Sequence, residues 1–272
     1  MKLKFILFLW QCILLCDLHV SVHSVPATGP NIRPTVEYEF PFVVFISTPP
    51  NMQQYNINSF FCTGSLISFR DVITAEHCLT NKQLKDVEIN AGSHDIRRTT
   101  TYYPEWWLSY ETWCQHKERA VEYPRNSILT IIRLNDTVSN AQPARILYTP
   151  KQNLVDKDVV LVTWGRGNTG RIPLISETGT AKVLTDDHCS NQYYTLRRRH
   201  LVVYETLFCT AADPFLIVDI GDAGSPVLYQ NQIVGVTRGA TPRNMDSTTL
   251  MNVHYNIHYF RQFITDVLID NF

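Results

Sequence analysis

Two neighbouring stretches of the chain decide its fold, FCTGSLIS at residues 61–68 and VITAEHC at residues 72–78. Both contain short runs of β-branched and apolar residues, which favour strands. Each stretch also carries one cysteine, Cys62 or Cys78, and the second cysteine directly follows His77. A lone histidine is more often a structural or surface residue than a functional one, so the meaning of His77 depends on these neighbours.

The rest of the chain continues this pattern of short strands. Asn, Gly, Pro and Asp cluster between the apolar runs and indicate turns. A helical spacing of apolar residues appears only near the end, over residues 259–268. Many short strands followed by one helix predict a β-barrel or β-sandwich domain without an internal repeat. The predicted strands include residues 42–46, 65–67, 87–91, 128–134, 159–163, 202–207 and 233–237.

The first residues indicate a secreted protein. A short basic start, an apolar run over residues 5–15 and a small-x-small sequence ending at Ser24 are typical of a cleaved signal peptide, with Ser21 as a second cleavage position. The apolar run is shorter than the roughly 20 residues that a membrane-spanning helix needs. We therefore predict a signal peptide over residues 1–24, an extended N-terminal arm over 25–36, and one extracellular domain over 37–272.

The composition is that of a globular domain. Hydrophobic residues make up 44% of the chain, which is ample for a packed core, and the formal net charge of −1 gives no indication of nucleic acid or membrane as a partner. Of the seven cysteines, Cys12 and Cys16 lie in the predicted signal peptide, so five remain in an oxidising compartment. Four of these can pair, and one is left over.

The two quoted stretches resemble the trypsin and chymotrypsin family, whose pattern is C-G-G-S-L-I followed by V-L-T-A-A-H-C. The family's E-F-P-W, G-W-G, M-F-C-A-G and G-D-S-G-G-P motifs are matched by EFPF at residues 39–42, TWG at 163–165, FCTA at 208–211 and GDAGSP at 221–226. The resemblance implies an all-β, chymotrypsin-like fold of two packed antiparallel six-stranded β-barrels with a C-terminal α-helix and an active cleft between the barrels. It also implies two disulfides, Cys62–Cys78 and Cys189–Cys209.

The catalytic triad of the family is degenerate in this chain. A serine protease needs an oxygen nucleophile, a histidine that takes its proton, and a buried carboxylate that orients the histidine. The resemblance places His77 at the histidine position and Ala223, whose methyl group attacks nothing, at the nucleophile position. The family's D-I-A-L-L-x-L strand aligns with residues 128–134, so Ile128 takes the place of the aspartate, or Ser127 after a shift by one residue. The chain is therefore expected not to be an enzyme.

The neighbouring groups are poor replacements. Ser225 lies two residues past the nucleophile position and is interpreted as a small turn residue. Glu76 adjoins His77, but adjacent side chains do not point at one another in the required way, so we expect Glu76 to be partly exposed or paired elsewhere. The backbone amides of Gly221 and Ala223 can still form an oxyanion-like pocket, which together with binding leaves only about 10³–10⁴-fold acceleration over water.

Two further departures concern activation and specificity. Members of the family mature by a cut before I-V-G-G, and the new amino terminus pairs with the aspartate beside the nucleophile, here Asp222. That sequence is missing before Phe40, so Asp222 is expected to lack its usual cation, with Val25 or another amine as the alternative. The disulfide that braces the specificity pocket is missing too: Asp219 stands at its first cysteine, and Ile217 stands near the pocket base in place of an acid.

Three features are left for binding. Cys114 matches no family disulfide and is a free buried thiol, half of an intermolecular disulfide, or part of a pairing that the motifs do not reveal. The basic run at residues 197–200 is either a site for an acidic partner or polysaccharide, or a solvated loop open to processing. Asn135 begins an N-x-T glycosylation sequon. No metal site and no cofactor is predicted, and His254 and His258 are expected at the surface.

These residues together predict a secreted, non-catalytic serine protease homologue that binds extracellular proteins. Family analogy suggests an insect-type homologue without a clip domain, acting as a partner, cofactor or decoy of active proteases in immune or reproductive fluids. Two alternatives stay open: an active serine endopeptidase with an atypical site, and a structural component assembled through a disulfide at Cys114.

Overall fold

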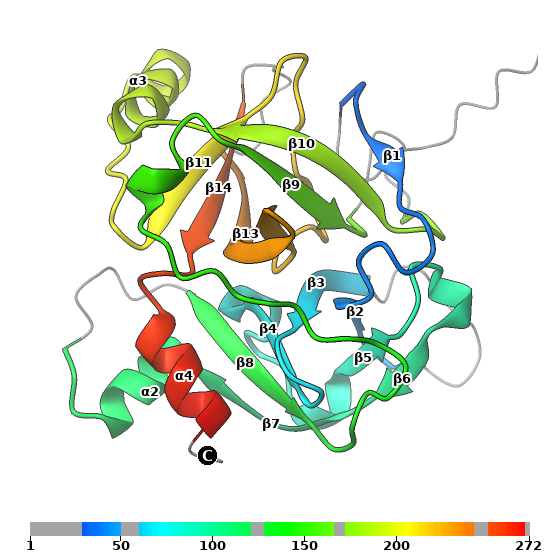
Figure 1. The fold of residues 1–272 in the computed structure, drawn as a ribbon. Helices are drawn as coiled ribbons and strands as arrows, with labels where there is room; N and C mark the ends of the chain where they lie inside the picture. Colours follow the sequence, from blue (N-terminus) through cyan, green and yellow to red (C-terminus); the bar gives the residue numbers. More distant parts are fainter. Residues whose placement is uncertain (1–28, 50–59, 121–127, 166–171, 242–249, 270–272) are drawn as a thin grey trace, which may run out of the picture.

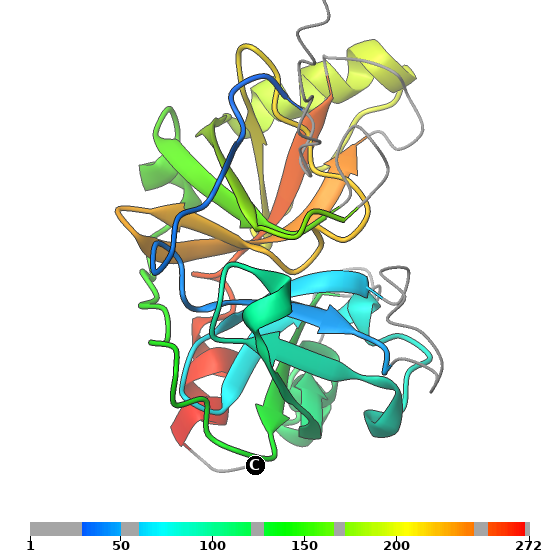
Figure 2. The same cartoon turned by 90° about the vertical axis from the view of Figure 1, so that its right-hand side faces the viewer.

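The computed structural model describes residues 29–49, 60–120, 128–165, 172–241 and 250–269, which form two barrels packed on one another (Figures 1 and 2). The predicted signal peptide lies outside the described residues. Each barrel is built from one antiparallel sheet. No helix in the described ranges combines the length and the apolar character that crossing a membrane requires.

The first barrel has the strand order β6-β5-β2-β3-β4-β8-β7. Its two edge strands, β6 and β7, are consecutive in the chain and separated only by Tyr103. Counted as one bent strand, they join the two ends of the sheet and give the expected six-stranded barrel. The strands are β2 (Val43–Ser47), β3 (Phe60–Leu66), β4 (Asp71–Ala75), β5 (Glu88–Ala91), β6 (Thr100–Tyr102), β7 (Pro104–Ser109) and β8 (Leu129–Leu134).

The second barrel closes through a direct pairing of β9 with β10. Its six strands are β9 (Asp158–Thr163), β10 (Glu177–Val183), β11 (Leu207–Ala211), β12 (Pro226–Tyr229), β13 (Gln232–Thr241) and β14 (Met251–Asn256). A short strand of the N-terminal arm, β1 (Arg33–Pro34), adds to the open side of β10. The arm therefore touches the second barrel before the chain enters the first one, as Figure 2 shows.

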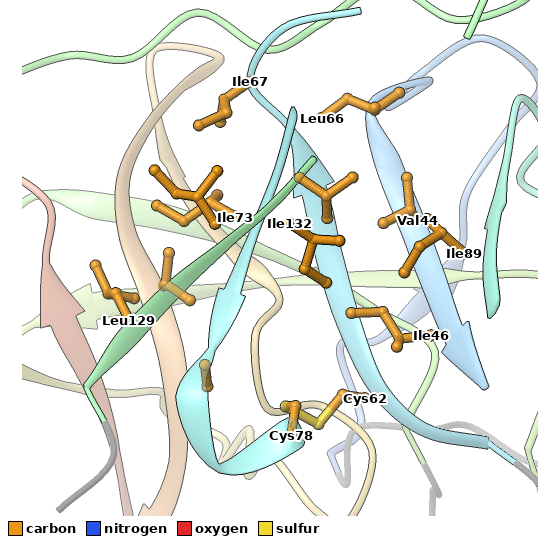
Figure 3. Packing of buried hydrophobic residues seen from close by; sticks show 14 of the residues in the cluster. Val44, Ile46, Cys62, Leu66, Ile67, Ile73, Cys78, Ile89, Leu129 and Ile132 are labelled. Atoms are coloured by element: carbon orange, nitrogen blue, oxygen red, sulfur yellow. A yellow bond between two sulfur atoms is a disulfide. The ribbon is translucent and has the colours of Figure 1, made fainter. Parts of the chain in front are cut away.

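Branched aliphatic side chains fill the first barrel. Every residue of β2 and β4 is buried, and Val44, Ile46 and Ile73 belong to one continuous cluster (Figure 3). Burial of each such side chain stabilises the fold by about 1.5–3 kcal/mol. The Cys62–Cys78 disulfide lies at one end of this cluster and belongs to it.

The C-terminal helix α4 (Arg261–Ile269) packs back onto the first barrel, although the chain reaches it after completing the second (Figure 1). It lies beside α2 (Tyr110–His116), and the Trp113 indole N–H donates a hydrogen bond to Asp266 at 3.2 Å. The last element thus ties the two barrels together, at a position within two residues of the predicted one.

Two helices and one strand boundary differ from the prediction. α2 and α3 (Asp186–Arg197) were not predicted. In the case of α3 the reason is that it buries only Cys189 and so shows no apolar stripe. The prediction of a strand over residues 202–207 is wrong, since pairing begins only at Leu207. Leu201 and Val203 instead pack against the Cys189–Cys209 region without joining the sheet. The described residues also include four short 3₁₀ helices: Glu76–Cys78, Leu84–Asp86, Ile96–Arg98 and Lys151–Leu154.

Candidate functional site

The segment Glu76–Cys78, which we call the histidine corner, follows directly on the buried strand β4. The Cys62–Cys78 disulfide ties it back to β3 (Figure 3). A ring nitrogen of half-buried His77 and both sulfurs of this disulfide lie within 4.8 Å of one another. Cysteine binds a metal as a thiolate, so the disulfide removes two of the three ligands and leaves no metal site at this corner.

The turn over residues 221–225, which we call the elbow, presents position 223. Its backbone is held by both barrels: the Ala223 carbonyl accepts a hydrogen bond from the Thr63 N–H at 2.9 Å, and the Gly224 N–H donates to the Thr237 carbonyl at 2.8 Å. The Thr63 hydroxyl donates to the Gly221 carbonyl at 3.0 Å. These bonds fix the backbone conformation of the elbow, while the side chain at its tip is only a methyl group.

Gly224 shows how closely the elbow fits its surroundings. Its φ of +86° lies in the left-handed region that glycine adopts most readily. A Cβ atom at this position would lie 2.1 Å from both the Thr63 carbonyl oxygen and the Thr74 hydroxyl. Glycine is therefore required here for two independent reasons, one conformational and one steric.

The carboxylate next to His77 in the chain binds a backbone amide. Ile128 is 9% exposed and packs in the core of the first barrel. Its backbone N–H donates a hydrogen bond to the Glu76 carboxylate at 3.0 Å. Glu76 is thus engaged with the residue that the resemblance aligns with the aspartate of the family. Ser127, the alternative alignment, lies outside the described residues.

The elbow keeps polar groups that are not nucleophiles. Ser225 is fully buried, and within the described ranges its hydroxyl has no hydrogen-bond partner. A hydroxyl nucleophile needs a base in hydrogen-bond contact, and the Ser225 hydroxyl has none among the described residues. The N–H groups of Gly221 and Ala223 donate no hydrogen bond to any other described residue, which leaves both donors of an oxyanion-like pocket unengaged.

A pair of buried acids lies behind the elbow. The Asp222 carboxylate accepts hydrogen bonds from the Thr163 hydroxyl and, at 2.7 Å, from the Asp219 N–H. Burial raises the pKa of Asp222 to about 7. Glu177 on β10 is 4% exposed, and its burial, with the Asp222 charge as a second cause, raises its pKa to about 8. Neither acid forms an ion pair in the described part of the chain, and Val25 lies outside it.

The segment where the family carries its third disulfide is held by an amide side chain instead. Asn252 on β14 accepts a hydrogen bond from the Val218 N–H and donates one to the Leu216 carbonyl, both at 2.9 Å. Asp219 is exposed, and Ile217 is half-buried near the expected pocket base. At that position the chain offers hydrocarbon rather than a carboxylate.

Cys114 is free and has no exposed area. Burial raises the pKa of its thiol, which lowers its reactivity. Because the thiol sits on the buried side of α2, an intermolecular disulfide would require this helix to leave the core. Both disulfides expected from the resemblance, Cys62–Cys78 and Cys189–Cys209, are formed.

Of the remaining residues named in the sequence analysis, some lie at the surface and one lies in the core. Asn135 is exposed just after β8, and the run at residues 197–200 is exposed around the C-terminal end of α3. His254 was expected at the surface, but it is fully buried on β14, where every residue is buried. Its two ring nitrogens contact the hydroxyls of Thr210 and Thr237 at 2.9 and 3.3 Å. Burial lowers its pKa to about 3, so His254 is a neutral core residue.

Three residues of this site were missed by sequence reasoning. Thr63 had a signal, since the chain reads C-T-G where the family pattern has C-G-G. Glu177 and Asn252 had none, because a single acid or amide in a predicted strand carries no pattern of its own. Their roles depend on which strands the fold brings together.

Comparisons with known proteins agree with this geometry. A sequence model of the family described as Trypsin matches residues 30–264. Chymotrypsin-2 of Vespa crabro is 25% identical over 234 residues, which cover 83% of this chain and 93% of that protein. Ovochymase-2 of Mus musculus is 26% identical over 65% of this chain, and snake venom serine protease NaSP of Naja atra is 24% identical over 72%. The matches span only 30% and 64% of these two proteins.

Solved structures show the same fold. The scabies mite inactivated protease paralogue S-D1 has a TM-score of 0.69 at 18% identity, covering 90% of this chain and 97% of its own. Neuropsin, a serine protease of mouse brain, has a TM-score of 0.67 at 16% identity, covering 87% and 98%. Since the family model matches most of the sequence and the two barrels are both present, the chain belongs to the trypsin family of serine proteases.

Proposed function

We propose that this protein is a non-catalytic member of the trypsin family that acts outside the cell by binding other proteins. The proposal rests on Ala223, which stands at the tip of an elbow whose backbone is fixed by Thr63 and Thr237. Covalent catalysis by this family requires an oxygen nucleophile that attacks the substrate carbonyl. A methyl group at this position forms no acyl-enzyme.

The histidine corner supports the same proposal. His77 has a hydrocarbon side chain, Ile128, where the orienting carboxylate belongs, and Glu76 is engaged with the Ile128 amide. Loss of the acid alone lowers turnover by about 10⁴ in enzymes of this type. A nucleophile supplied from elsewhere would therefore be poorly activated.

Features that the chain retains support a role outside the cell. Two disulfides and a start typical of a signal peptide point to an oxidising compartment. The exposed Asn135 fits a glycosylated loop. One solved structure with this fold is described as an inactivated protease paralogue. By analogy with the family, we propose that this chain serves as a partner, cofactor or decoy of active proteases in an immune or reproductive fluid.

An activity screen tests the proposal. The purified protein and its His77→Ala variant are incubated with a mixed peptide library and with a fluorophosphonate probe, beside active trypsin. We expect both forms to cleave no peptide and to bind no probe. Cleavage or labelling that His77→Ala abolishes would instead establish an active endopeptidase with an atypical site.

A second test addresses assembly. Non-reducing gels of the purified protein are expected to show a monomeric band, because the Cys114 thiol is buried. A disulfide-linked species that Cys114→Ser removes would favour the structural alternative over the proposed role.

A further inference from the structure

A pocket with a volume of about 250 Å³ lies between the segment that connects β1 to β2 and the first barrel. The segment around Phe40 forms one wall, and the loop that follows β5, together with Asn140, forms the other. Figures 1 and 2 show this connecting segment passing from the second barrel at β1 to the first barrel at β2. The pocket shares no residue with the elbow or the histidine corner. Its size is slightly below the 300–1,000 Å³ of drug-sized sites, which suits a ligand of one sugar ring.

The carboxylate and the guanidinium that line the pocket pair with each other. Glu37 and Arg98 both line it and form an ion pair at 3.1 Å, with side chains 46% and 61% exposed. A charged ligand would have to compete with one partner of this pair. A neutral ligand rich in hydroxyl groups can donate to the carboxylate and accept from the guanidinium while the pair stays intact, since both groups have spare hydrogen-bonding capacity.

Asn140 supplies a third polar group, and the glycine at position 92 leaves space for its side chain. Asn140 lines the pocket next to Gly92, whose φ is +92°. A Cβ on Gly92 would lie 2.1 Å from the Asn140 side-chain nitrogen. Glycine therefore makes room for an amide that can both donate and accept hydrogen bonds.

Tyr38 places an aromatic ring at the pocket, and its backbone conformation is unusual. Tyr38 is 79% exposed, more than any other large hydrophobic side chain that the structure describes. Its φ of +64° is uncommon for a residue other than glycine or asparagine, and such strain is often found at ligand sites. An exposed ring has an apolar face on which the C–H side of a sugar can pack. We propose that this pocket binds a neutral saccharide, with one sugar face on Tyr38 and its hydroxyls on Glu37, Arg98 and Asn140.

The test uses the full secreted chain with Asn135→Gln, which keeps any glycan of its own out of the measurement. The protein is titrated with N-acetylglucosamine, mannose and galactose, and with glucuronic acid as a charged probe, followed by NMR or calorimetry. We expect saturable binding of at least one neutral sugar, with a Kd of about 1 mM, as is usual for a small polar ligand.

Two variants locate the binding. Tyr38→Asn removes the ring but keeps a residue that tolerates positive φ, and we expect it to weaken binding by about tenfold. Glu37→Gln removes the negative charge, so the affinity for the neutral sugar falls and that for glucuronic acid rises. Tyr194→Ala, at an exposed tyrosine on α3 outside the pocket, serves as the matched control and is expected to change nothing.

Three results would overturn the proposal. The first is no saturable binding of any neutral sugar up to about 50 mM. The second is binding that Tyr38→Asn and Glu37→Gln leave unchanged. The third is binding of glucuronic acid alone by the parent protein. Because Tyr38 and Glu37 are exposed, the variants are expected to keep the melting temperature of the parent, which confirms that they fold. None of these outcomes depends on whether the elbow is active.

Discussion

The elbow and the histidine corner match the family pattern in opposite respects. At the elbow the backbone is held by bonds to Thr63 and Thr237, and the side chain at position 223 is a methyl group. At the histidine corner the side chain of His77 is present, and the neighbouring Glu76 carboxylate accepts a hydrogen bond from the Ile128 N–H. The difference teaches that the backbone of the elbow is part of the packing between the barrels, whereas the side chain at position 223 is not. The side chain at position 223 can therefore change without disturbing the packing of the two barrels.

The largest effect is expected where the backbone of the elbow is tested. In Gly224→Ala, the new methyl group meets the Thr63 carbonyl and the Thr74 hydroxyl, and the backbone is strained at φ +86°. We expect the free energy of unfolding to fall by about 3 kcal/mol or more, measured by urea denaturation.

Ala223→Ser is the matched control at the neighbouring position, where one oxygen is added to a half-buried side chain. We expect it to change the free energy of unfolding by less than about 1 kcal/mol. Equal losses in the two variants would mean that the elbow does not hold the barrels together as described.

A second, smaller effect concerns the buried acids behind the elbow. The pKa of Glu177 rises from an ordinary value of 4.5 to about 8 in the folded protein. The folded state therefore binds more protons than the unfolded state between these values, and the stabilisation present below pH 4.5 is lost as the pH rises through 8.

Glu177→Gln removes this titration while keeping the shape of the side chain. We expect the variant to be more stable than the parent by about 2 kcal/mol at pH 8 and nearly equal to it at pH 5, from thermal or urea unfolding at both pH values. If an amine paired with Asp222, removing Glu177 would instead make the protein less stable at pH 8.

The smallest effect is expected at the histidine corner. Glu76→Ala removes the acceptor of the Ile128 N–H, a hydrogen bond of 3.0 Å to a half-buried carboxylate. We expect a loss of about 1 kcal/mol in the free energy of unfolding. Glu76→Gln keeps an acceptor oxygen and is expected to lose about half as much, so equal losses in the two variants would argue against this bond.

The sequence predicts most of the fold and only part of the site. The strands around Cys62 and Cys78 and the last helix follow from local periodicity and motif matches, which need no knowledge of strand pairing. α3 escaped prediction because its stability comes from the Thr185 cap and the disulfide at Cys189 rather than from an apolar stripe. The buried His254 escaped because a polar residue in a fully buried strand cannot be distinguished from a surface one by pattern.

The contacts of the site depend on register. Ala75 of β4 pairs with Leu129 of β8, which brings Glu76 opposite Ile128. Glu177 of β10 pairs with Thr163 of β9, whose hydroxyl binds Asp222. Neither pairing can be predicted from the sequence, because the paired residues lie far apart in the chain. Motif matches thus locate the positions that align with the triad of the family, and the strand register determines which groups lie opposite them.

The proposal that this protein is non-catalytic is tested most directly by placing a serine at position 223. Ala223→Ser is assayed for peptide hydrolysis and fluorophosphonate labelling beside a triple variant that adds Ile128→Asp and Glu76→Ala. We expect no turnover from Ala223→Ser, because Ile128 supplies no carboxylate and loss of the acid of a triad lowers turnover by about 10⁴. The triple variant is expected to label faster. Robust turnover by Ala223→Ser alone would contradict the assignment of positions 128 and 223.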